Sequence, residues 1–192
     1  MVTSQDDIRG EEPKGGQMKE ASEAFTVDVK AAIYGGGNVI SVDDSNAGYG
    51  VPFNEVGATG DENILGVSLD GTKKVSINTY KTTGKIGVVR HGVVDVCLAD
   101  DSQAIALGNY LRAEVDEITY DGIATCKIGA VDLLAPTALT TTGDAVTSVK
   151  MQTLLIELSE IVGMALEANA GSIGGYIKCF LTLMPHYRVA TA

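Results

Sequence analysis

Short runs of apolar and β-branched residues, separated by glycine and aspartate turns, recur along most of this chain. The run at 24–34 places Phe25, Val27 and Val29 on one side and polar residues between them. This period of two is typical of a strand with one buried face. Similar runs follow at 38–44, 64–70, 73–80, 85–90, 93–99, 110–115, 123–135 and 174–183. Turns are predicted at residues 35–38, Asp70-Gly71, Gly84, His91-Gly92 and Gly108-Asn109. The sequence therefore predicts an all-β protein, a small β-barrel or sandwich with at most one or two short helices.

One phrase of seven residues occurs in both halves of the chain. Residues 64–70 read ILGVSLD and residues 161–167 read IVGMALE, each with a glycine in third place. We predict that both are strands, in which the glycine marks a bend or the close approach of another backbone. The second copy has an alternative, because apolar residues within 151–170 recur at i, i+3, i+4 and i+7, as in an amphipathic helix. The strand interpretation also places a strand at 153–158.

The predicted organisation is an N-terminal arm, residues 1–24, followed by one β-rich domain, residues 25–192. The arm is polar, contains glycine and proline, and lacks apolar periodicity, so it is either flexible or draped over a neighbour. Residues 45–63 read as a long loop, which in a compact domain indicates a functional segment or one packed against a neighbour. Its Tyr49 and Phe53 fit two roles, stacking on a sugar ring or packing in the interior.

The balance of charge limits the partners. The 192 residues include 25 acidic and 14 basic ones, a formal net charge of −11, whereas proteins that hold nucleic acid neutralise its phosphates. We therefore expect no nucleic-acid partner. The sequence contains no secretory signal and no apolar run of about 18 residues, so we expect synthesis in the cytoplasm and no membrane partner. Cys97, Cys126 and Cys179 lie far apart in apolar runs, typical of buried free thiols.

No catalytic, cofactor or metal site is predicted. The two histidines, His91 and His186, lie in a predicted turn and in the C-terminal tail, and neither has a spaced partner for catalysis or metal binding. Glycines 35–37 follow a strand but lack the lysine and hydroxyl residue that complete a phosphate-binding loop, so a hairpin turn is favoured. The acidic pairs near turns lack the alternating spacing of a calcium loop. We therefore expect a protein that is not an enzyme.

Residues 60–183 resemble the small capsid decoration, or cement, proteins of tailed bacteriophages and related viruses. In that family a strand reading lGva precedes a V-x-x-x-G-x-v-x-V hairpin and an a-I-x-x-G-d-x-l turn, and the chain closes on iGxAlE-a-x-a-G-x-x-v-x-V-x-L. The matching positions here are Gly66, Gly92, Ile105, Gly108, Leu111, Gly163, Ala165, Leu166, Glu167 and Gly171. Gly66, Gly92, Gly108, Gly163 and Gly171 are predicted to be structural glycines. There are two departures: Asn109 stands where the family usually has Asp, and the segment before residue 60 is longer than the family norm.

The resemblance implies a β-barrel of the β-tulip type with a structural role and no cofactor. It implies binding to the outer surface of an icosahedral shell, with the major capsid protein as partner, and stabilisation of the head by homotrimers at local threefold positions. Such a protein is made in the host cytoplasm and ends on the exterior of the virion. Two alternatives stay open. One is a carbohydrate-binding or host-surface-binding module of a virion, and the other is the major capsid protein itself, which would need a long helix in residues 151–170.

Overall fold

In the residues that the structure describes, the regular secondary structure is β-strand except at Leu158. The structure, a computed structural model, describes residues 20–42, 49–53, 64–76, 79–99, 104–120, 123–134, 158, 160–169 and 175–183. The strands in these residues are β1 (Glu20–Val29), β2 (Val39–Val42), β3 (Gly50–Pro52), β4 (Ile64–Ser68), β5 (Lys74–Ser76), β6 (Thr79–Tyr80), β7 (Gly84–Cys97), β8 (Tyr110–Tyr120), β9 (Ile123–Leu133), β10 (Ile161–Ala165) and β11 (Tyr176–Thr182). The all-β fold predicted from the alternating runs is confirmed.

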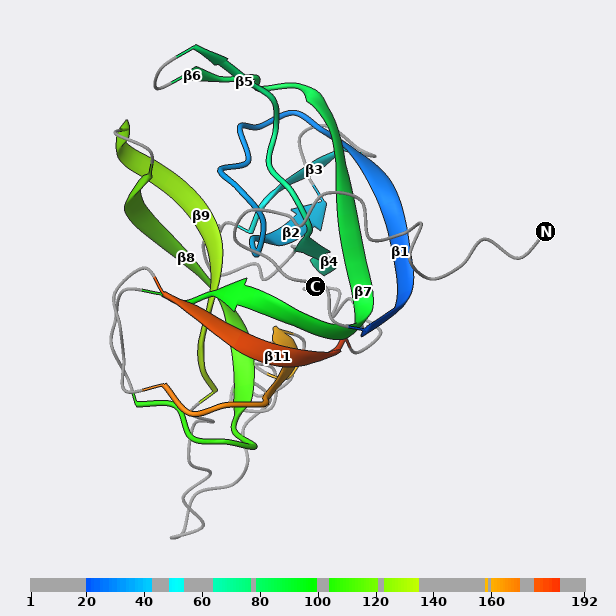
Figure 1. The fold of residues 1–192 in the computed structure, drawn as a ribbon, viewed down its shortest axis with the longest axis vertical. Helices are drawn as coiled ribbons and strands as arrows, with labels where there is room; N and C mark the ends of the chain where they lie inside the picture. Colours follow the sequence, from blue (N-terminus) through cyan, green and yellow to red (C-terminus); the bar gives the residue numbers. More distant parts are fainter. Residues whose placement is uncertain are drawn as a thin grey trace, which may run out of the picture.

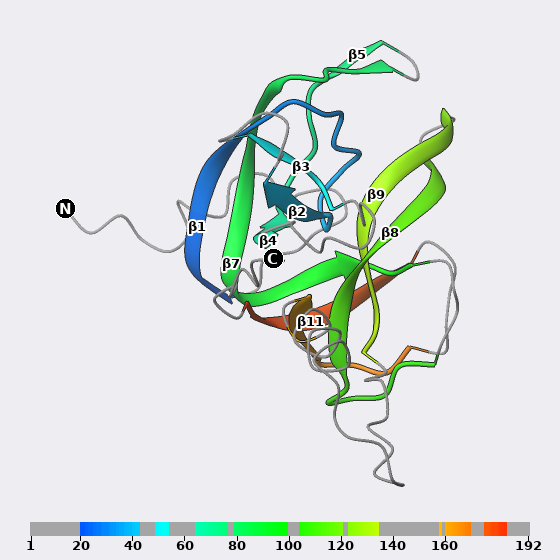
Figure 2. The same cartoon turned by 180° about the vertical axis from the view of Figure 1, so that it is seen from behind.

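Two closed rings of strands share β7 (Figure 1). The first barrel consists of β1, β3, β2, β4 and β7, and the pairing of β1 with β7 closes it. The second barrel consists of β7, β11, β10, β8 and β9. A parallel bridge between Leu98, directly after β7, and Val131 of β9 closes this second ring. Figure 2, the view from behind, shows β7 running from beside β1 in the first barrel to beside β11 in the second.

Strand β7 passes straight through the turn predicted at His91-Gly92. The strand is continuous over Gly84–Cys97, and its pairing with β1 only shifts register opposite His91. Gly92 has a φ of 125° there, which side chains other than glycine rarely tolerate. The predicted turn is wrong, because this glycine belongs to a β-bulge, which bends a strand without reversing it.

Most buried side chains of β7 belong to two core clusters, and the division does not fall at the bulge, because Val89 before it already belongs to the larger cluster. Ile86 and Val88, also before the bulge, belong to a cluster in the first barrel. Val94 and Val96, after it, belong to a larger cluster that draws residues from both barrels, such as Val39, Val67, Leu111, Val162, Ile177 and Leu181. Full burial of one such side chain contributes about 1.5–3 kcal/mol. The larger cluster therefore joins the two barrels through a common interior.

The two copies of the repeated phrase form β4 and β10, and their glycines face neighbouring backbones in the same way. A β-carbon on Gly66 would strike the carbonyl oxygen of Val89 in β7. A β-carbon on Gly163 would strike the carbonyl oxygen of Phe180 in β11. At both places the next strand lies closer than any side chain would allow.

The strand predicted at 161–167 is confirmed over the bounds of β10, so the amphipathic helix does not extend through it. Of the strand predicted at 153–158, only Leu158 is among the described residues, and its backbone is helical. The prediction is wrong at this residue, in agreement with the helical spacing of its apolar neighbours. Residues 153–157 lie outside the described residues.

Three further boundaries differ from the sequence-based prediction. Strand β1 begins at Glu20, inside the predicted arm, because its first residues already pair with β7. The loop predicted over 45–63 contains β3, which pairs with β2 and, at Val29–Gly50, with β1. The run at 73–80 is not one strand but the hairpin of β5 and β6. Residues 1–19 of the arm lie outside the described residues, as do Gly171, His186 and the threonine-rich segment 137–149.

Candidate functional site

The hairpin of β5 and β6 forms a two-stranded sheet of its own, at one end of the molecule (Figure 1). Lys74 and Tyr80 are register partners, and the amide of Lys81 donates a hydrogen bond of 2.9 Å to the carbonyl of Lys73. A hairpin of two strands is at best marginally stable in water without other contacts. Its position therefore depends on how its base is attached.

Thr72 fixes the base of the hairpin to the segment after β1. Its amide donates to the carbonyl of Ile33 at 2.9 Å, and its side-chain oxygen accepts from the amide of Ile33 at 3.1 Å. Both residues are buried. Tyr80 also packs edge-on against Tyr34, with ring centroids 5.2 Å apart. The hairpin is thus held firmly at its base while β5 stays exposed along its length.

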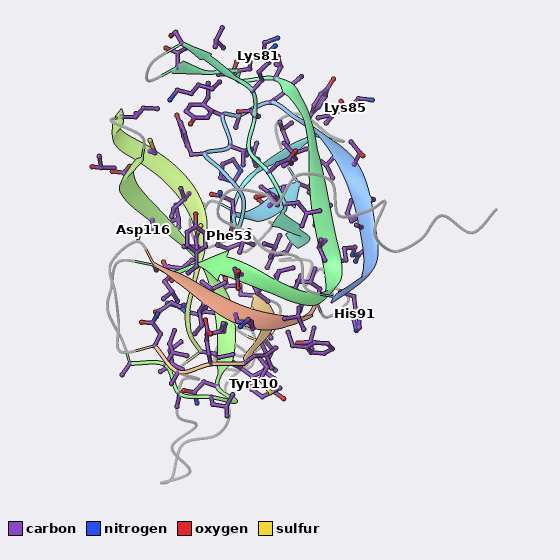
Figure 3. The ribbon with its side chains drawn as sticks, in the orientation of Figure 1. Phe53, Lys81, Lys85, His91, Tyr110 and Asp116 are labelled. Carbon is purple, nitrogen blue, oxygen red and sulfur yellow. The ribbon has the colours of Figure 1, made fainter. Side chains whose placement is uncertain are left out.

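Five lysines gather at this end of the molecule. Three belong to the hairpin and its flanks, and two lie at the adjoining ends of β1 and β7, where Asp28 pairs with Lys85. Figure 3 shows Lys81 beside the hairpin and Lys85 on β7, at the same end of the molecule. The five are exposed and include more than a third of the chain's 14 basic residues: Lys30, Lys73, Lys74, Lys81 and Lys85. We call this group, together with Val75, the lysine end.

Val75 adds an apolar side chain to the lysine end: it lies between Lys74 and Ser76 in β5, and 60% of it is exposed. Two acidic residues, Asp28 and Asp70, lie among the lysines. The Asp70 carboxylate accepts a hydrogen bond of 2.9 Å from the amide of Gly87. Burial raises the pKa of Asp70, and that hydrogen bond only partly offsets the rise. Among the described residues at this end, five lysines outnumber these two carboxylates, in a chain whose net charge is −11.

The ribbon of β8 and β9 carries the opposite charge. Glu114, Asp116 and Glu117 follow one another closely along β8. Glu114 forms a salt bridge of 2.8 Å with Arg112, and the Asp116 carboxylate accepts a hydrogen bond from the Glu117 amide at 2.7 Å. Glu117 is exposed, and its register partner on β9 is Lys127. Asp116 lies on this ribbon, away from the strands of the first barrel (Figure 3).

The aromatic residues of the predicted 45–63 loop do not form a platform together. Phe53 is only 4% exposed and belongs to the larger core cluster, because its amide bonds to the carbonyl of Val39. Tyr49 is half-buried, and the Nζ of Lys30 lies 4.1 Å from the centroid of its ring. Phe53 is therefore a packing residue.

Glycines 35–37 form the connection between β1 and β2 and use their polar groups internally. The amide of Gly37 donates to the carbonyl of Ser68 at 2.7 Å. The side-chain amide of Asn38 donates to the carbonyls of Tyr34 and Gly35, at 3.2 and 3.1 Å. Gly35 and Gly37 have φ values of 77° and 82°, which glycine tolerates in a turn. The hairpin predicted here is wrong, because β3 lies between β1 and β2 in the sheet. The Gly37 amide is already bonded within the fold.

The remaining residues singled out in the sequence lie apart from one another. His91 is exposed on β7 and packs edge-on against Phe180, with ring centroids 5.2 Å apart. Gly108 forms the predicted turn, with a φ of 87°. The thiols of Cys97 and Cys179 are buried, and burial raises the pKa of each to about 12. Such thiols are poor nucleophiles.

Among the residues that the structure describes, no three His, Cys, Asp or Glu side chains come together as a metal site. Within the same part of the chain, no helix is long and apolar enough to cross a membrane. The sequence matches no protein-family model and no curated protein. The feature that sequence reasoning missed is the lysine end, although four lysines within residues 73–85 of an acidic chain are a signal for it.

Proposed function

We propose that this chain is a capsid decoration protein. It binds the outer surface of an icosahedral shell through the major capsid protein and stabilises the head without catalysis, as a homotrimer at local threefold positions. The observation that carries the proposal is the repeated phrase within residues 60–183. Gly66 and Gly163 hold the two family positions, and each faces the carbonyl of the next strand.

The chemistry of the described residues supports a binding role. Cys97, Cys126 and Cys179 are buried, and His91 packs against an aromatic ring. The anchored hairpin offers its lysines and the exposed Val75 to a partner. Leu107 and Tyr110, outside the hairpin, are exposed apolar residues as well. A preformed surface loses little conformational entropy on binding, which suits a protein that must adhere permanently to a lattice.

The test is co-sedimentation with empty, expanded shells assembled from the proposed partner, the major capsid protein of the same virus. We expect binding that saturates at a fixed ratio of copies to shell subunits and raises the temperature at which the shells dissociate. Protein that is folded by circular dichroism and stays in the supernatant at every ratio would overturn the proposal. Binding to a glycan array that is lost in Tyr49→Ala would point to the carbohydrate-binding alternative.

The arm can be tested separately, because β1 begins only at Glu20. Deletion of residues 1–19 should weaken shell binding and leave the melting temperature within a few degrees of the full chain, because every described strand is retained. The measurement is the same co-sedimentation assay with a thermal melt of each protein. If the deletion leaves shell binding unchanged, the arm is not part of the binding surface.

A further inference from the structure

We propose that the lysine end of one copy docks on the acidic β8–β9 ribbon of a second copy. The proposed function includes self-association into trimers, and this proposal says which two surfaces touch in it. It rests on the proposed function only for the number of copies in the assembly. It joins two different surfaces, so it is a head-to-tail contact. Repeated contacts of this kind close into a ring or continue as a filament.

Charge is the first argument. The lysine end brings Lys30, Lys73, Lys74, Lys81 and Lys85 to one place, whereas the chain as a whole has a net charge of −11. An acidic protein with one basic end offers its own acidic surface as the complementary partner. Nucleic acid fits less well, because its uniform negative charge would also meet the chain's 25 acidic residues.

The shape of the hairpin is the second argument. Its base is fixed by the hydrogen bonds between Thr72 and Ile33 and by the edge-on packing of Tyr80 against Tyr34. Its exposed strand carries Val75, a β-branched side chain that is 60% exposed. An apolar centre surrounded by charged residues is the usual anatomy of a protein–protein contact. A hairpin already held in place also loses little freedom when it binds.

The acceptor is the ribbon formed by the longest antiparallel pair in the second barrel. Asp116 and Glu117 lie on β8 of this ribbon, and Glu117 is exposed. Glu114 forms a salt bridge of 2.8 Å with Arg112, and the exposed Glu117 is the carboxylate that a lysine of another copy would meet. Contacts between exposed charges are weakened by salt, because the screening length falls from about 10 Å at 0.1 M to about 3 Å at 1 M.

Sedimentation velocity of the full chain tests the contact. At 20 mM NaCl we expect a species larger than the monomer, and at 1 M NaCl we expect mostly monomer. Lys81→Glu and Glu117→Lys should each weaken association at low salt at least tenfold. A chain with both substitutions should recover most of the loss, because the reversed charges attract again. Arg90→Glu, which reverses an exposed charge on β7 outside the lysine end, is the matched control and should associate like the unchanged chain.

Several outcomes would overturn the proposal. They are a monomer at 20 mM NaCl, association that does not respond to salt or to Lys81→Glu, and no recovery in the doubly substituted chain. Preferential binding of plasmid DNA or an acidic peptide by the lysine end would also overturn it. Circular dichroism of each variant shows that folding is retained. Shell binding is measured independently, so a chain that self-associates but ignores shells rejects the proposed function and leaves this contact standing.

Discussion

Replacing Gly129 with alanine tests whether the two barrels depend on a direct contact between backbones. Gly129 lies in β9, and a methyl group there would strike the carbonyl oxygen of Val39 and lie 2.8 Å from the amide nitrogen of Phe53. These two atoms are joined by a hydrogen bond of 2.8 Å that follows the pairing of β2 with β3. The added methyl must therefore displace β9 or break that bond.

The cost can be bounded from known effects. Overpacking in a close-packed interior costs about 1–3 kcal/mol. Leaving a buried amide without its acceptor costs about 1–3 kcal/mol. The loss of freedom in the unfolded chain offsets about 0.4–1 kcal/mol of this. We therefore expect Gly129→Ala to lose about 1–6 kcal/mol of unfolding free energy, or about 2–24 °C in Tm for a chain of this size.

The assay is urea unfolding followed by far-UV circular dichroism, with a calorimetric melt as a second measurement. Gly84→Ala in β7 is the matched control, because a β-carbon at Gly84 meets nothing within 4 Å. The control should unfold within about 1 kcal/mol of the unchanged chain. If Gly129→Ala also unfolds with the midpoint of the unchanged chain, the close contact between β9 and β2–β3 is refuted.

Three further predictions follow from the same structure. Gly163→Ala should lose about 1–3 kcal/mol in urea unfolding, because its methyl would strike the β11 backbone; an unchanged midpoint would contradict this. Stability should fall as pH rises from 9 toward 12, by about 1.4 kcal/mol per pH unit for each of Cys97 and Cys179, because these thiols stay protonated when folded and ionise when unfolded. Urea unfolding at pH 8 and pH 10 measures this slope. If a variant with alanine at both Cys97 and Cys179 shows the same slope, these thiols are not its cause. Thr72→Val should leave the Ile33 amide without its side-chain acceptor, at a cost of about 1–3 kcal/mol, and should speed hydrogen exchange at that amide.

The strands of this fold follow from the sequence because alternation of apolar and polar residues is a local signal. The continuity of β7 does not, because a glycine with positive φ serves a turn and a bulge equally well. At Gly92 the choice depends on β1 and β11, which both pair with the strand there. Partner strands distant in sequence settled what the local pattern left ambiguous.

The candidate site was less predictable than the fold. Lys30 joins the lysines of the hairpin only because β1 and β7 pair in a register that places Asp28 opposite Lys85. Phe53 is buried because its amide reaches the carbonyl of Val39. Neither relation has a signature in the residues themselves, since each depends on hydrogen bonds between segments far apart in the chain.

The position of β7 in the chain has a consequence for synthesis on the ribosome. Every strand of the first barrel precedes Leu98, so this barrel can close while the later strands are still being translated. The second half of β7 then presents an open edge until β11, the last strand, arrives to pair with Cys97 through His91. An open edge is a site of aggregation in a nascent chain. The nascent chain is therefore most exposed to aggregation, and most in need of a chaperone, between the translation of β7 and the translation of β11.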